Sequence, residues 1–135
     1  MKHLPAFILL AACTLLALPA FAAGNALKEI STAIEHSGFA SEVKTTAKVH
    51  LHLHHVVNCL VGPHGVGFYP AAGDPCKGMG NGALNDLSGH PKARKALETA
   101  LHDARKGLSS NQFKAAHSTA LKVETALMIA KAADH

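Results

Sequence analysis

The stretch of sequence that decides the fold is SEVKTTAKVHLHLHHVVNCLVGP, residues 41–63. Its apolar side chains recur at spacings of four, three and four residues, at Val49, Leu53, Val56 and Leu60. This spacing places them on one face of a helix that Gly62-Pro63 would end. The Val56-Val57 pair and the polar–apolar alternation from His50 to Leu53 favour a strand instead. Because the helical repeat is the longer pattern, we predict a helix over residues 41–61.

A shorter amphipathic stretch precedes this helix, over residues 26–37. Asn25 is placed to cap its first turn, and Gly38 is placed to end it. One face of the stretch is apolar and carries Leu27, Ile30 and Ile34. We therefore predict a helix here whose apolar face turns toward the core.

Two more helices are predicted in the C-terminal third of the chain. The first covers residues 91–106 and would end at Gly107, and the second covers residues 109–133, where Ser109 and Gln112 fit a capping box. Their apolar stripes consist of Ala93, Leu97, Ala100, Leu101, Ala104, Leu108, Phe113, Ala116, Ala120, Val123 and Leu127. The short connection predicts an antiparallel hairpin, so the fold class is all-α, a small bundle of about four helices.

The segment between the second and third helices has a different composition. Residues 62–91 contain eight glycines and four prolines, which cannot sustain a long helix. We predict a long irregular loop over residues 62–90. Long loops inside small domains are usually functional or held by cross-links, so this loop is a candidate surface for a protein partner.

Residues 1–22 have the features of a secretory signal peptide. Lys2 supplies a positive charge, an apolar run follows, and Ala20-Phe21-Ala22 fits a cleavage site. A lipoprotein site at Cys13 is the less favoured alternative, because the apolar run continues past that cysteine. The sequence thus predicts a periplasmic or secreted protein whose residues 23–135 form a single helical domain, with no stable membrane anchor.

Cleavage would leave two cysteines, Cys59 and Cys76. In an exported chain such a pair is expected to form a disulfide, which would stabilise the fold by about 3 kcal/mol. A free-thiolate copper site is the alternative. The predicted disulfide would fasten the glycine- and proline-rich loop to the helix that precedes it.

The composition excludes several function classes. Charged residues make up 16% of the chain, the formal net charge is +4, and tryptophan is absent, which disfavours nucleic-acid binding. No zinc-protease, nucleophile-elbow, phosphate-loop or c-type haem motif is present, so we predict that the protein is not an enzyme. Histidine is the residue in excess, at 11 of 135.

Four of these histidines lie within HLHLHH, residues 50–55. On a helical wheel, His50 and His54 flank the apolar face and can reach one metal ion. His117 and Glu124 lie near the apolar face of the last helix and would complete an inner site for copper, zinc or nickel.

The wheel offers a second arrangement for a metal. His52 and His55 fall on the outward side of the same helix, where they form an alternative surface site. His36 and His102 lie opposite the apolar faces of their helices, and we expect both to be solvated. The two arrangements predict different sets of metal ligands.

The last two helices also carry the segments ALHDA, residues 100–104, and AAHS, residues 115–118. Together with the signal peptide, they resemble the small periplasmic metal-binding proteins. That resemblance implies a histidine-rich helical bundle that takes up copper and other divalent ions.

The leading functional prediction is therefore periplasmic binding, buffering or delivery of copper, nickel or zinc. One alternative is a non-enzymatic interaction module that uses the disulfide-pinned loop. Another is non-covalent haem binding through His50 or His54.

Overall fold

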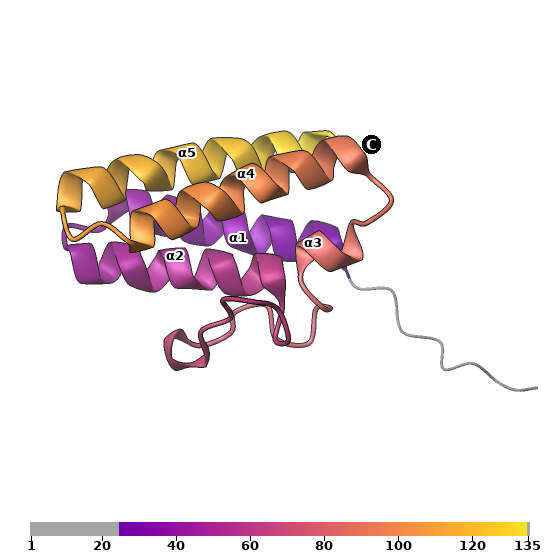
Figure 1. Cartoon of the computed structure of the whole chain (residues 1–135), viewed down its shortest axis with the longest axis horizontal. Coiled ribbons are helices and arrows are strands. Elements are labelled where there is room, and N and C mark those ends of the chain that lie inside the picture. The colour runs from indigo at the N-terminus through magenta and orange to yellow at the C-terminus, as the bar shows by residue number, and fades with distance from the viewer. Residues whose placement is uncertain (1–24, 135) are drawn as a thin grey trace, which may run out of the picture.

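The computed structural model describes residues 25–134, and every regular element within that range is a helix. The predicted signal peptide and Cys13 lie outside the described residues. The helices are α1 (Ala26–Glu42), α2 (Thr46–Val61), the 3₁₀ helix η1 (Pro70–Ala72), α3 (Ala83–Asp86), α4 (Pro91–Leu108) and α5 (Phe113–Ala132). The four long helices form a bundle in which α1 packs against α2 and α5, and α4 packs against α5 and α2 (Figure 1). The predicted all-α bundle is confirmed.

The start of α1 agrees with the sequence, whereas its end does not. Asn25 caps the helix, because its Oδ1 accepts a hydrogen bond of 3.0 Å from the backbone N–H of Lys28. The helix then continues through Gly38 to Glu42. A Cβ on Gly38 would lie 3.9 Å from the carboxylate of Glu124, so the residue lies within a helix–helix contact. The prediction that Gly38 ends the helix is wrong.

The prediction that Gly107 ends its helix is also wrong, because this glycine lies inside α4. A Cβ at this position would overlap with Oγ1 of Thr119 and lie 2.6 Å from Cδ1 of Leu53. The glycine lets three helices approach closely, and α4 continues to Leu108. The predicted capping box does not form either: the Oγ of Ser110 accepts from the N–H of Gln112, and α5 begins at Phe113.

The helix that carries the histidines begins later than predicted. It starts at Thr46 and is capped by Thr45, whose side chain accepts a hydrogen bond of 3.4 Å from the N–H of Lys48. Its predicted apolar face is fully buried, and so are most positions of the stripes in α4 and α5. An exception in α1 is Leu27, which is 38% exposed. The apolar pattern therefore predicts the core residues, whereas the helix ends depend on contacts between helices.

The long loop after α2 lies along one side of the bundle (Figure 1). It contains η1 and α3, two short helices within the segment predicted to be irregular. The start of the loop crosses a later part of it at Gly62 and Gly82, both with positive φ, and a Cβ on either would overlap with the backbone of the other segment. The predicted disulfide is present, joining Cys59 in α2 to Cys76 in the loop. The loop is thus fixed to α2 at several points.

Candidate metal site

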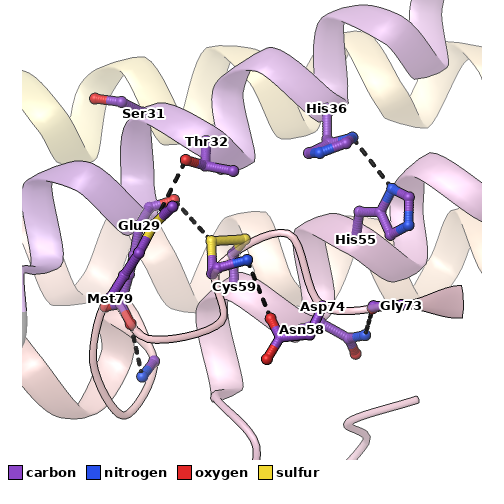
Figure 2. The surroundings of a disulfide bond; sticks show 12 residues. Glu29, Ser31, Thr32, His36, His55, Asn58, Cys59, Gly73, Asp74 and Met79 are labelled. Carbon is purple, nitrogen blue, oxygen red and sulfur yellow. Dashed lines mark hydrogen bonds between the residues drawn. A yellow bond between two sulfur atoms is a disulfide. The ribbon is translucent and has the colours of Figure 1, made fainter. Parts of the chain in front are cut away.

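Three histidine side chains converge between α1 and α2. Nδ1 of His36 lies 3.2 Å from Nδ1 of His52 and 3.2 Å from Nδ1 of His55. Among residues 25–134, this is the one group of three or more histidine, cysteine, aspartate or glutamate side chains whose ligand atoms all lie within 4.8 Å of one another. Figure 2 shows the rings of His36 and His55 turned toward each other from the two helices. The group can hold a metal ion.

Helical periodicity explains how two of the three residues reach one point. His52 and His55 are three residues apart on α2, so their rings leave the same side of that helix. His36 faces them from α1, the neighbouring helix of the bundle. Phe39, one turn further along α1, packs on the rings of His36 and His52 with centroids 5.6 and 5.4 Å away. The aromatic ring covers one side of the cluster.

The hydrogen bonds of His55 define which of its nitrogens is free to bind. Its Nε2 lies 2.7 Å from the backbone carbonyl oxygen of Ala72 in η1. A carbonyl only accepts, so Nε2 carries the proton and Nδ1 presents a lone pair to the other two rings. Metal-bound histidines commonly donate their second N–H in this way.

The spacing of the nitrogens is suited to a transition-metal ion. Nitrogens bound to a tetrahedral ion at about 2.0–2.1 Å lie about 3.3 Å from one another. The two observed separations of 3.2 Å are close to that value. In the metal-free protein the Nδ1 of His55 accepts, so the 3.2 Å contact with His36 requires a proton on the Nδ1 of His36, which a bound ion would displace.

Burial favours the uncharged form of two of these imidazoles, those of His36 and His52. Burial, followed by the neighbouring His55 and His52, lowers the pKa of His36 from 6.5 to about 4. Burial also lowers the pKa of His52, with smaller contributions from His55 and Lys48. Neutral imidazole is the form that binds metals. The rings of His36 and His52 are therefore in the form that binds metal at neutral pH.

The residues predicted for the inner site are placed apart from this cluster. Nε2 of His50 donates to the carbonyl of Ser110 at 3.0 Å, and Nε2 of His117 donates to the carbonyl of Ser41 at 2.6 Å. The ring of His54 lies against Tyr69, 4.4 Å between centroids, and Glu124 lies beside Gly38. No three of these four predicted residues converge within the part of the chain that the structure describes.

Of the predicted ligands, the structure brings together His52 and His55, the outward pair. It adds His36. The prediction that this residue is solvated is wrong, because the ring is half-buried between α1 and α2. The spacing of residues in the sequence does indicate that His36 lies in a helix contact. Thr32, His36 and Phe39 are spaced by four and three residues, which marks a second contact face on this helix.

The cysteines do not contribute thiolates to the site. Cys59 lies one turn beyond His55 but is bonded to Cys76 and is fully buried. The cluster is therefore an all-imidazole donor set.

Comparisons with known proteins give no relative from which a function can be transferred. No protein-family model, curated protein or solved structure matches this chain. None of the helices in residues 25–134 combines the length and the apolar character that a membrane-spanning helix requires. The function has to be inferred from the chain's own side chains.

Proposed function

We propose that the protein binds a divalent transition-metal ion through His36, His52 and His55, and that it buffers or delivers copper, nickel or zinc in the periplasm. The observation that supports this proposal most directly is the convergence of three imidazole nitrogens on one point between two helices.

The donor set indicates the class of metal. Imidazole suits copper, zinc and nickel, whereas calcium and magnesium prefer oxygen ligands. Among the divalent ions, copper is expected to bind most tightly by the general affinity order. The lowered pKa values of His36 and His52 favour binding at neutral pH, because protons compete less for the same nitrogens.

The number of ligands supports exchange rather than permanent storage. Structural zinc sites are closed by four protein ligands, whereas three protein ligands leave a position for water or for a ligand from another molecule. A site with three histidines can release its ion to a partner by ligand exchange. This chemistry is what a buffer or a delivery protein requires.

Two further features support a periplasmic setting. The disulfide between Cys59 and Cys76 is of the kind that persists in oxidising compartments. The N-terminal sequence predicts export, and the resemblance to small periplasmic metal-binding proteins has the same implication.

The test is calorimetric titration of the oxidised protein with Cu(II), Zn(II) and Ni(II) at pH 7. His36→Ala and His55→Ala should each weaken the first binding step by at least about tenfold, because each removes one of three ligands. His102→Ala is the matched control, since His102 is exposed on α4. Unchanged affinity in both cluster variants would contradict the proposal.

His50→Ala tests the inner set of ligands that the sequence predicted. The structure has Nε2 of His50 donating to the carbonyl of Ser110 and not to the cluster. The variant should bind the first metal ion as tightly as the parent protein. A large loss of affinity would instead favour the inner site.

A further inference from the structure

The loop after α2 is joined to the histidine cluster by a hydrogen bond to a backbone oxygen. This atom is the carbonyl oxygen of Ala72, the last residue of η1, which accepts the hydrogen bond of His55 Nε2. The direction of the His55 ring therefore depends on where η1 lies. The loop is the outer layer of the candidate metal site.

Asn58 fixes both ends of η1. Its side-chain Nδ2 donates to the carbonyls of Tyr69, at 2.9 Å, and Gly73, at 2.7 Å, and its Oδ1 accepts from the N–H of Tyr69 at 2.8 Å. Tyr69 directly precedes η1 and Gly73 directly follows it. The clamp therefore encloses the segment that carries Ala72.

The placement of Asn58 is rigid. It lies three residues after His55 on α2, so both side chains leave the same face of that helix. It is fully buried, and both donors and the acceptor of its amide are used. Figure 2 shows Asn58 next to Gly73 and near the disulfide of Cys59. A buried amide with this many partners specifies one geometry of the loop.

Gly73 allows the loop to turn close to the site. Its φ is +92°, which disfavours side chains, and a Cβ there would lie 3.8 Å from Nε2 of His55. The chain thus passes the histidine ring at near contact distance and returns to the clamp.

We propose that Asn58 is the positioning residue of the metal site. By holding η1, it directs the Ala72 carbonyl at Nε2 of His55, which keeps the proton on that nitrogen and the Nδ1 lone pair toward His36. This inference rests on the proposed function. Loss of the direct hydrogen-bond partner of a metal-bound histidine usually lowers metal affinity by about 10- to 100-fold, and Asn58 holds that partner in place.

The test combines a titration with a measurement that needs no metal. Asn58→Ala should weaken Zn(II) binding by about 10- to 100-fold. In the metal-free protein, the ¹⁵N chemical shifts of the His55 ring should show loss of the fixed Nε2–H form. Asn85→Ala is the matched control, because it removes the hydrogen bond from Asn85 to the carbonyl of Asn81, away from the cluster.

The outcomes separate positioning from general stability. If Asn58→Ala leaves the His55 ring shifts unchanged, and Zn(II) affinity stays at the parent value, Asn58 is only structural and the proposal is overturned. Asn58→Asp keeps the acceptor for Tyr69 but loses both donors, and it replaces the alanine variant if that variant does not fold. Circular dichroism establishes that each variant is helical before measurement.

Failure of the proposed function would give a different result. In that case the parent protein itself would bind no Zn(II), while the ring shifts of His55 in the metal-free variants would still show whether Asn58 fixes that ring.

Discussion

Replacing Glu29 by glutamine is expected to make the protein more stable at alkaline pH. Glu29 lies in α1 with 1% of its surface exposed, and its Oε1 accepts a hydrogen bond of 3.0 Å from the N–H of Gly82. Its Oε2 is buried and has no hydrogen-bond partner among the described residues. The pKa of this carboxyl is raised from 4.5 to about 7, mainly by burial and also by the charge of Asp86, against the opposing effect of the hydrogen bond from Gly82.

The raised pKa of Glu29 determines how the stability of the parent protein changes with pH. The folded state holds the proton more tightly than the unfolded state, so this contribution to the free energy of unfolding is fully present below pH 4.5. It is lost as the pH rises from 4.5 to about 7. Above pH 7, the shift in the pKa of Glu29 between the unfolded and folded states lowers the free energy of unfolding by about 3 kcal/mol. Glutamine keeps the shape and the acceptor for Gly82 but carries no charge to be buried.

The assay is urea denaturation of the parent protein and Glu29→Gln at pH 5 and pH 8. The two should be similar at pH 5, whereas the variant should be more stable by about 3 kcal/mol at pH 8. Glu98→Gln is the control, because Glu98 is an exposed partner of Arg94 and should change stability by less than about 0.5 kcal/mol. If the advantage of Glu29→Gln did not grow between pH 5 and pH 8, the reasoning would be refuted.

Three further outcomes are expected. Gly107→Ala should destabilise the fold, because the new methyl group would overlap with Thr119 and Leu53. Such overpacking costs about 1–3 kcal/mol, which exceeds the gain of about 1 kcal/mol from the higher helix propensity of alanine. A higher urea midpoint for the variant would contradict this. Reduction of the disulfide by a dithiol should remove about 3 kcal/mol and lower the melting temperature, and an unchanged melting curve would show that the cross-link does not matter. Because the pKa of His36 is lowered to about 4, its contribution to stability is present above pH 6.5 and lost as the pH falls toward 4. His36→Gln should therefore flatten the acid side of the stability profile in urea titrations, and an unaltered slope would contradict the assignment.

The sequence predicted those parts of the fold that depend on local periodicity. The apolar repeat in α2 and the pairing of Cys59 with Cys76 are both present. The helix ends at Gly38 and Gly107 were wrong for one physical reason. A glycine ends a helix when it adopts a left-handed conformation, but a glycine that lets two helices touch stays helical. Tertiary contacts decide between these roles, and a single helix does not contain that information.

The candidate site shows the same limit. His52 and His55 share a face of α2, so their proximity was predictable from spacing alone. A helical wheel centred on one apolar stripe places His36 in solvent, because it ignores contacts with a second neighbouring helix. His117 was assigned to the site, yet its ring reaches the carbonyl of Ser41 near the end of α1. Unpaired carbonyls at helix ends attract such donors, and a wheel does not represent them.

The disulfide also has a consequence for the rate of folding. The bundle consists of two local hairpins, α1–α2 and α4–α5, which must dock across the chain between residues 61 and 91. With Cys76 already attached to α2, the free part of that connection is shortened by about half, to residues 77–90. Halving a loop lowers its closure cost by about 0.6 kcal/mol. The chain loses this loop-closure entropy before the two hairpins form contacts with each other. The oxidised chain should therefore fold about two- to threefold faster than the reduced one.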